Sequence, residues 1–190
     1  MTAAVRRPYG ELDRAGVVAS LHSLARRVGV QGVTMRELAA ELGAAVPSVY
    51  YHVPGKQAAL DMLAESVLAQ IPVPESGSWD SRLVELYCCA WEVIVAVPGI
   101  AGVLQTNGGG ESARRLDKLS RSLLAEAGLT KAVATASHSV LYTYLLGSIS
   151  LEESHPGQRG TRLAANRFRS GLDVIMAGIK ASSREGSAQR

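Results

Sequence analysis

The chain has few of the residues that mark secreted, membrane-embedded or metal-bound proteins. Its 190 residues include two cysteines, four histidines and one phenylalanine. Cys88 and Cys89 are adjacent within a helical pattern, so their side chains point to different faces and do not indicate a disulfide scaffold. No apolar stretch is long enough to span a bilayer, and residues 1–8 lack the apolar segment of a signal peptide. We therefore expect a reduced, cytoplasmic protein with no membrane partner.

Signatures of catalysis and of metal binding are also missing. The sequence has no nucleophile elbow and no paired metal-ligand spacing. The glycine run at 107–110 is not followed by the Lys-Ser/Thr pair of a phosphate-binding loop. The histidines are isolated in sequence, and Glu152 and Glu153 indicate a solvated helix end. We expect no enzyme activity, no bound metal and no cofactor.

The strongest positive signal is the stretch 34–52, which predicts a helix, a tight turn and a second short helix. Thr34 can cap the first helix, Gly43 comes where the chain must turn at positive φ, and Pro47 suits the first turn of the second helix. This is the pattern of a helix-turn-helix, which places its second helix in the major groove of DNA. An ordinary helical hairpin is the alternative that these residues leave open.

Helical periodicity continues on both sides of this stretch. Upstream, Asp13 can cap a helix that ends near Gly29, and downstream a further helix reaches Ile71. We expect residues 13–71 to form the DNA-binding domain, a three-helix unit with the helix-turn-helix inside it and the further helix packed against it. Residues 1–12 are expected to be an N-terminal arm.

Net charge distinguishes this domain only weakly. Residues 1–71 contain seven Lys or Arg against six Asp or Glu. A DNA-binding protein without an obvious basic stripe must place its cations selectively, and its affinity should depend only modestly on salt. We expect the acidic Glu41, Asp61 and Glu65 to face away from DNA. The cations expected to face phosphate are Arg6, Arg7, Arg26, Arg27, Arg36 and Lys56.

After a linker at 72–78 the remaining sequence predicts helices only, so the expected fold class is all-α. We expect residues 76–183 to form a helical effector-binding and dimerisation bundle, and residues 184–190 to be a frayed tail. The expected helices cover 79–94, a short segment ending at 105, 116–124 with Gly128 closing it, 130–154 and 161–181.

Small side chains recur among apolar ones on the last two long helices, at 130–154 and 161–181. They include Gly147 on the first helix, and Gly171 and Gly178 on the second. Small side chains permit helices to approach closely, so we expect the two helices to pair with their copies as a four-helix bundle in a homodimer. An intramolecular core of small residues is the alternative.

Four runs of the sequence closely resemble the N-terminal domain of TetR-type transcriptional repressors: 12–18, 33–39, 47–53 and 56–61. Within them, Tyr50-Tyr51-His52-Val53 and Lys56 are most similar to the tetracycline repressor branch. A fainter similarity to the ligand-binding core of that branch covers 146–155. The resemblance implies a dimeric, sequence-specific regulator that binds double-stranded DNA at a palindromic operator and is released by a small-molecule effector.

The resemblance also assigns DNA-contacting positions. It places Arg36, Val46, Pro47 and Tyr50 at bases, and Thr34, Met35, Ser48, Tyr51, His52 and Lys56 at or beside the DNA backbone. Val46 stands where tetracycline repressors carry a glutamine, and Met35 replaces a threonine that would bond a phosphate. Arg36 can bond a guanine through two hydrogen bonds. We therefore expect an operator that differs from a tetracycline operator.

The effector expected from the resemblance can be tested against the residues. Val103 stands where a metal-binding histidine is expected, and Leu151 where a metal-linked glutamate is expected; Glu152 lies about 100° further round the helix. Valine and leucine cannot ligate magnesium, so we expect a largely apolar ligand and not a magnesium–tetracycline complex. The residues expected to hold it are Tyr87, Trp91, Leu104, Gln105, Asn107, Leu119, Leu123, His138, Tyr142 and Leu145.

Two other classes of function stay open at this level. One is a helical ligand-binding or scaffold protein with a vestigial helix-turn-helix, and the other is a small helical enzyme. A regulator would retard promoter DNA from beside its own gene in a gel shift, whereas neither alternative would do so.

Overall fold

The structure, a computed structural model, describes residues 12–106, 109–154, 157 and 160–188, with side chains as far as residue 183. All regular secondary structure in these residues is helical, which confirms the all-α expectation. The helices are α1 (Arg14–Gly32), α2 (Met35–Leu42), α3 (Val46–His52), α4 (Lys56–Ala69), α5 (Trp79–Val95), α6 (Ile100–Thr106), α7 (Glu111–Glu126), α8 (Lys131–Glu153) and α9 (Arg162–Ala188).

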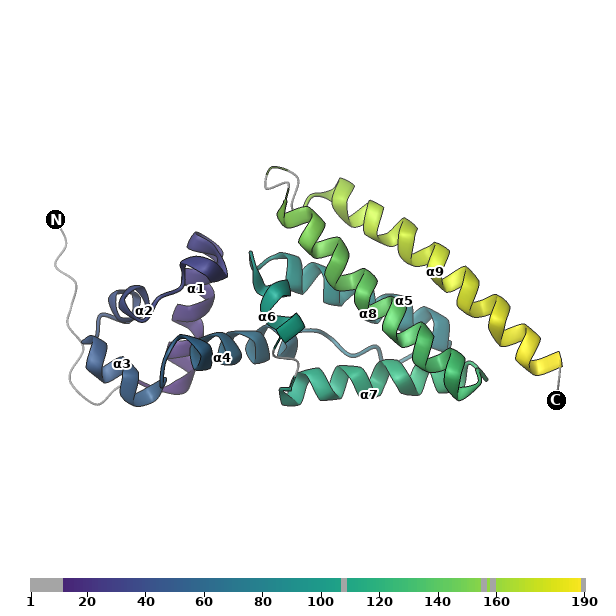
Figure 1. Cartoon of the computed structure of the whole chain (residues 1–190), viewed down its shortest axis with the longest axis horizontal. Coiled ribbons are helices and arrows are strands. Elements are labelled where there is room, and N and C mark those ends of the chain that lie inside the picture. The colour runs from purple at the N-terminus through teal and green to yellow at the C-terminus, as the bar shows by residue number, and fades with distance from the viewer. Residues whose placement is uncertain (1–11, 107–108, 155–156, 158–159, 189–190) are drawn as a thin grey trace.

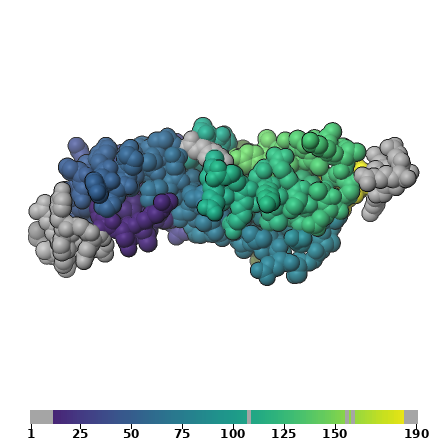
Figure 2. All heavy atoms as spheres, turned by 90° about the horizontal axis from the view of Figure 1, so that it is seen from below, coloured from purple at the N-terminus to yellow at the C-terminus, as the bar shows by residue number. Residues whose placement is uncertain are grey.

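The helices gather at two ends of an elongated molecule. Helices α1–α4 lie at the N-terminal end, and α5–α9 form a bundle in which α8 and α9 run side by side (Figure 1). The view turned by 90° has the same two ends, with the N-terminal half on one side and the later helices on the other (Figure 2). Helix α4 belongs to the first group and also contacts α5, α6 and α7 of the bundle.

Local sequence signals explain where the first helix begins and bends. The Gly16 N–H donates to Asp13 Oδ1 at 2.6 Å, so Asp13 is the N-cap that the sequence predicts. Gly29 has φ 73° and ψ 163°, which interrupts the helix at the predicted position, and a last helical turn continues to Gly32. Glycine adopts this positive φ without the steric cost that other residues incur.

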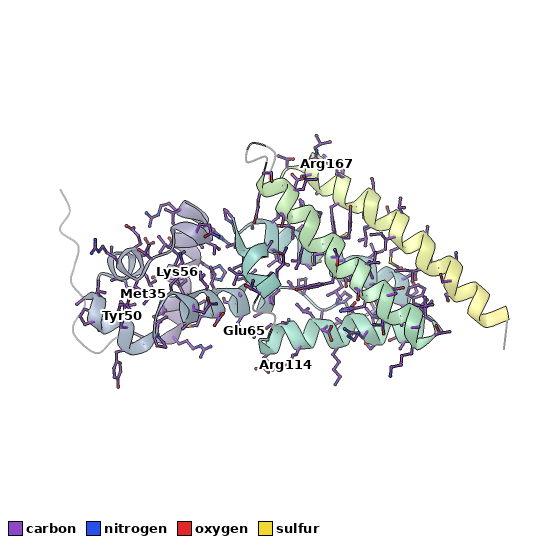
Figure 3. The ribbon with its side chains drawn as sticks, viewed as in Figure 1. Met35, Tyr50, Lys56, Glu65, Arg114 and Arg167 are labelled. Atoms are coloured by element: carbon purple, nitrogen blue, oxygen red, sulfur yellow. The ribbon has the colours of Figure 1, made fainter. Side chains whose placement is uncertain are left out.

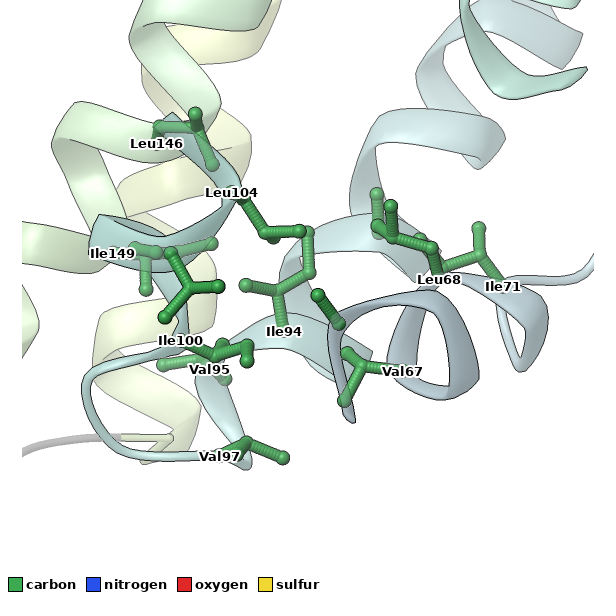
Figure 4. Close-up of a cluster of buried hydrophobic side chains, with 14 of the residues drawn as sticks. Val67, Leu68, Ile71, Ile94, Val95, Val97, Ile100, Leu104, Leu146 and Ile149 are labelled. Atoms are coloured by element: carbon green, nitrogen blue, oxygen red, sulfur yellow. The ribbon is translucent and has the colours of Figure 1, made fainter. Parts of the chain in front are cut away.

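A cluster of buried apolar side chains joins the two ends of the molecule (Figure 4). Val67 and Leu68 of α4 lie in it with Ile94 of α5, Ile100 of α6 and Ile149 of α8. Because the cluster draws on helices from both groups, α4 cannot move far without disturbing this packing.

A second junction between the two ends consists of backbone atoms. The Val30 N–H, just after the break at Gly29, donates to the Pro98 carbonyl oxygen at 2.8 Å. Gly99 has φ 83°, and a Cβ at this position would lie 3.3 Å from Val30 Cβ. The Gly99 N–H donates in turn to Glu153 Oε1 at 2.7 Å. The end of α8 therefore holds the turn on which the last part of α1 rests.

The structure corrects the expectation that Glu152 and Glu153 form a solvated helix end. Glu152 is only 5% exposed, and its Oε1 accepts a hydrogen bond from Arg167 at 2.7 Å. Glu153 is half-buried because it caps the Gly99 N–H. The partners come from α9 and from the turn before α6, which sequence spacing on α8 alone does not reveal.

The C-terminal helix is longer than expected. Helix α9 continues to Ala188, past the expected end at 181 and into the segment that the sequence predicts as frayed. Among the described helices, none is both long and apolar enough to cross a membrane alone. Helices α5 and α6 would suffice together by length and composition, but they are bent by 117°.

Candidate DNA-binding surface and effector cavity

The helix-turn-helix is held in place by caps and by buried contacts. Thr34 Oγ1 accepts from the Glu37 N–H at 3.1 Å at the start of α2. Gly43, with φ 62° and ψ 29°, ends α2 in the left-handed conformation, and its N–H bonds to the carbonyls of Ala39 and Ala40. Val49 of α3 is fully buried. These features fix the angle between the two helices and leave the opposite face of α3 in solvent.

The exposed face of α3 carries polar and aromatic side chains. Tyr51 is 86% exposed, Tyr50 is 49% exposed, and His52 is also exposed. Tyr50 and Lys56 lie near the N-terminal end of the molecule (Figure 3). Lys56 Nζ donates to the Gln31 carbonyl at 3.0 Å, so the start of α4 is tied to the last turn of α1.

A cavity of about 640 Å³ lies among α5, α7 and α8 of the bundle, and Leu68 near the end of α4 and Ile71 just after it also line it. Apolar side chains make up most of its wall, and Tyr142 O–H donates to the Leu104 carbonyl at 3.3 Å across it. Its volume lies within the range of small-molecule sites in proteins, which are usually apolar with a few placed polar groups. The residues that line it include Leu68, Ile71, Leu86, Tyr87, Ala90, Ile94, Leu104, Leu116, Asp117, Ser120, His138, Tyr142, Leu145 and Leu146.

One side of the cavity carries a chain of hydrogen-bonded polar groups from three helices. Tyr87 of α5 lies 3.1 Å from Ser120 Oγ of α7, and Ser120 Oγ lies 3.1 Å from His138 Nδ1 of α8. His138 Nε2 lies 2.8 Å from Asp117 Oδ1, and Asp117 also pairs with Arg121. We refer to these five residues as the polar chain.

Burial and neighbouring charges set the protonation states in the polar chain. Burial lowers the pKa of His138, and the Arg121 charge adds to this, outweighing the opposite effect of Asp117. The hydrogen bond from Arg121 lowers the pKa of Asp117. Burial raises the pKa of Tyr87 to about 12. At neutral pH, Asp117 is therefore ionised, His138 is neutral and Tyr87 keeps its hydroxyl hydrogen.

Comparison with known proteins shows the family to which the chain belongs. A family model described as bacterial regulatory proteins, tetR family, matches residues 18–61. An HTH-type transcriptional regulator of Saccharopolyspora erythraea is 31% identical over 158 residues, covering 80% of this chain and 67% of that protein. The chain belongs to the tetR family of bacterial regulatory proteins. It is a DNA-binding transcriptional regulator.

Further relatives of this tetR-family regulator include tetracycline repressors. The tetracycline repressor protein class D of Escherichia coli is 40% identical over 76 residues, which are 38% of this chain and 35% of that protein. The fold matches the crystal structure of a TetR variant from Acinetobacter baumannii AYE in complex with minocycline. That match has a TM-score of 0.78 and 25% identity and covers 90% of this chain and 98% of the other.

Most positions that the resemblance assigns to DNA lie at the surface of this tetR-family regulator. Val46 and Ser48 are half-buried. The exposed ones are Thr34, Arg36, Pro47, Tyr50, Tyr51, His52 and Lys56. Met35 differs because it is only 7% exposed, and its side chain packs into the core under α2. Only the Met35 backbone N–H, in the first turn of α2, remains for a phosphate.

One charge expectation for the tetR-family head needs correction, that Arg27 faces phosphate while Glu41 faces away. Arg27 does not face phosphate alone, because it forms an ion pair with Glu41 on the same surface. Glu65 faces the bundle, where its Oε1 accepts from the Ser112 N–H at the start of α7 at 2.9 Å. Arg26 and Arg36 are exposed as expected. Arg6 and Arg7 lie outside the described residues.

The cavity contains half of the residues predicted for the effector site. Tyr87, Leu104, His138, Tyr142 and Leu145 line it. Trp91 is buried elsewhere and stacks on Phe168 with ring centroids 5.6 Å apart. Leu119 and Leu123 pack into the core, Gln105 is exposed, and Asn107 lies outside the described residues.

Sequence reasoning missed the polar part of α7. Asp117, Ser120 and Arg121 all line the cavity, together with Ala113 and Leu116. The signal was present, because Ala113, Leu116 and Ser120 recur at helical spacing and share one face. An apolar stripe does not reveal this polar part, because Asp117, Ser120 and Arg121 are polar and their side chains are as compatible with solvent as with a cavity wall.

The described residues contain no group of three or more His, Cys, Asp or Glu that could hold a metal ion. Val103 is buried but does not line the cavity, and Leu151 is 62% exposed. His155, which belongs to the fainter region of resemblance, lies outside the described residues.

Proposed function

We propose that this regulator binds a palindromic operator as a homodimer and releases it when a small-molecule effector fills the cavity, without catalysing a reaction. Residues 13–71 serve as the DNA-binding domain, and residues 76–183 bind the effector and dimerise. The observation that carries the proposal is the position of α4. This helix begins at Lys56 beside α3 and reaches the cavity wall at Leu68.

Helix α4 gives the effector a direct mechanical route to the DNA-binding head. An occupant that presses on Leu68 or Ile71 changes the position of α4 relative to α5 and α7. The two heads of a dimer must match two half-sites, so a small change in their separation weakens binding. The effector then favours the DNA-free arrangement by binding it more tightly than the DNA-bound one.

Exposed apolar side chains on α8 and α9 support dimerisation through these helices. Val140 and Leu151 on α8 are 51% and 62% exposed, and Leu163 and Val174 on α9 are 60% and 74% exposed. In each pair the residues lie about three helical turns apart, so they share one face. Monomeric proteins seldom leave such apolar surface in water. A second copy of α8 and α9 would cover it in a four-helix bundle.

The glycines on these helices divide between the two roles that the sequence leaves open. A Cβ built on Gly147 or Gly178 would have no described atom within 4 Å, so both glycines face outward, where a second copy can approach. Gly171 instead faces the Tyr144 hydroxyl, which leaves no room for a Cβ. Tyr144 donates to the Phe168 carbonyl at 3.0 Å, so Gly171 serves the packing of α8 on α9 within one chain.

The effector that suits the cavity is largely apolar. A magnesium–tetracycline complex would bring a charged chelate against a largely apolar wall, whose described residues include no group of three or more metal-ligating side chains, at a high desolvation cost. Titration with tetracycline in a calorimeter, with and without magnesium, should therefore show no magnesium-dependent binding. Micromolar affinity that appears only with magnesium would contradict this prediction.

Selection of DNA by the purified protein tests the regulatory function itself. From a pool of random duplexes, the full-length protein should enrich a sequence with two-fold symmetry and should retard it in a gel shift. The enriched sequence should also occur in the intergenic DNA beside the gene. Failure to enrich any sequence would instead favour a ligand-binding protein with a vestigial helix-turn-helix.

A further inference from the structure

The protonation states determine which group donates and which accepts in each hydrogen bond of the polar chain, so the chain of donors has one direction. Ionised Asp117 can only accept hydrogen bonds, so His138 Nε2 must carry the hydrogen that lies between them. A neutral histidine has only one N–H, which leaves Nδ1 as an acceptor. The Ser120 hydroxyl must then donate to Nδ1, and the Tyr87 hydroxyl must donate to Ser120 Oγ.

This direction engages the hydroxyl hydrogens of Tyr87 and Ser120 at the inner side of the cavity, whereas the Thr143 hydroxyl, which also lines the cavity, belongs to an exposed residue. Tyr87 and Ser120 each donate their single hydroxyl hydrogen to another group of the polar chain. Tyr142 donates to the Leu104 carbonyl, and Ser139 donates to the Thr135 carbonyl at 3.1 Å. What these hydroxyl groups still offer is lone pairs, which accept hydrogen bonds.

The polar groups of the cavity therefore differ between its inner side and its rim. At its inner side lie Tyr87 and Ser120, which are 5% and 2% exposed and offer acceptors. At its rim lie Arg114 and Arg121, which are exposed and offer guanidinium donors. Arg114 projects from the start of α7 at the outside of the bundle (Figure 3). An occupant must complement acceptors inside and cations outside.

We infer that the effector is a mainly apolar molecule with a hydroxyl or N–H group that donates a hydrogen bond to Tyr87 Oη. This inference rests on the proposed effector role of the cavity and specifies the ligand class. A ligand that offers only acceptors at this end would leave the Tyr87 lone pairs without a partner and would displace any water bound there. The polar chain thus favours ligands with a hydrogen-bond donor at this end, and the apolar wall favours ligands whose remaining part is apolar.

Two probes of the same shape test this selection. The compounds are 2-naphthol, which has a donor, and 2-methylnaphthalene, which does not, and their dissociation constants give a preference ratio. The test variant is Tyr87→Phe/Ser120→Ala, which removes both inner acceptors, since Ser120 could replace Tyr87 if left in place. The matched control is Tyr144→Phe, because the Tyr144 hydroxyl bonds the Phe168 carbonyl and does not line the cavity.

The preference for 2-naphthol over 2-methylnaphthalene should fall by about three- to tenfold in the double variant, the effect of one neutral hydrogen bond. It should be unchanged in Tyr144→Phe. An equal preference in the double variant and in the wild type would overturn the inference. Binding of neither compound would overturn both the inference and the proposed apolar effector site, while a gel shift of the same samples reports DNA binding separately.

A spectroscopic measurement on the wild-type protein is independent of how the double variant folds. Imidazole ¹⁵N chemical shifts should show His138 as the neutral tautomer with its hydrogen on Nε2 at neutral pH. A hydrogen on Nδ1 would mean that Ser120 accepts from His138 and that the chain runs in the opposite direction. That result would overturn the inference, because Tyr87 could then keep a free hydrogen for an acceptor ligand.

Discussion

A protein carrying Val140→Asp together with Val174→Asp should be a monomer and should bind its operator about 100-fold or more weakly than the wild type. Both side chains lie on the exposed apolar faces of α8 and α9. Four aspartates brought together in a dimer would repel one another and would lose their water. A monomer must bind each half-site independently and loses the gain that comes from linking two sites. Light scattering at micromolar concentration and a gel shift measure the two effects.

The control for this pair is Val73→Asp, a similar change at a residue that is 39% exposed in the linker before α5. This variant should remain a dimer and keep its operator affinity. Because the substituted side chains of the double variant point into solvent within one chain, its helical content should be unchanged by circular dichroism. A dimer mass for the folded double variant would show that the subunits pair through another surface.

Replacement of Arg36 by alanine should weaken operator binding by about 10- to 100-fold and relax the sequence preference at one base pair of each half-site. The resemblance places this exposed arginine of α2 at a base, and a two-pronged contact with guanine contributes about 1–3 kcal/mol of discrimination. Quantitative gel shifts on the selected operator and on its single-base variants measure both effects.

Arg26→Ala provides the comparison for Arg36→Ala. Arg26 is exposed on α1, and a phosphate contact from it would add affinity without reading sequence. Its loss should weaken binding to all duplexes by a similar factor and should reduce the salt dependence. If Arg36→Ala left the affinity and the base preference unchanged, the assignment of Arg36 to a base would be wrong.

Local signals account for what the sequence predicts well. Thr34, Gly43 and Asp13 act within a few residues of themselves, and the structure confirms that each caps or ends a helix where it was expected. Such signals depend on backbone geometry near the residue and not on distant partners. The helix-turn-helix could therefore be predicted almost completely, whereas the continuation of α9 to Ala188 could not, since the sequence at 182–188 is mostly polar and carries no apolar stripe.

Partners from distant helices account for what the sequence did not predict. Met35 is buried because α2 turns that side inward, although its position was assigned to the DNA backbone. Trp91 faces Phe168, 77 positions later, and not the cavity. Glu152 is buried because Arg167 reaches it from α9. In each case the side chain type allows two environments, and only tertiary packing decides between them.

The backbone hydrogen bond from the Val30 N–H to the Pro98 carbonyl has a consequence for how proteins of this family diversify. Main-chain atoms are the same in every sequence, so this hydrogen bond between head and core requires little beyond glycines at 29 and 99 and the Glu153 side chain that bonds the Gly99 N–H. The DNA-reading surface and the cavity wall can each accumulate substitutions without altering this hydrogen bond. A head from a relative with the same two glycines, and with apolar side chains at the α4 positions of Val67 and Leu68, could thus be grafted onto this core and retain its angle. The hybrid would have one protein's operator and the other's inducer.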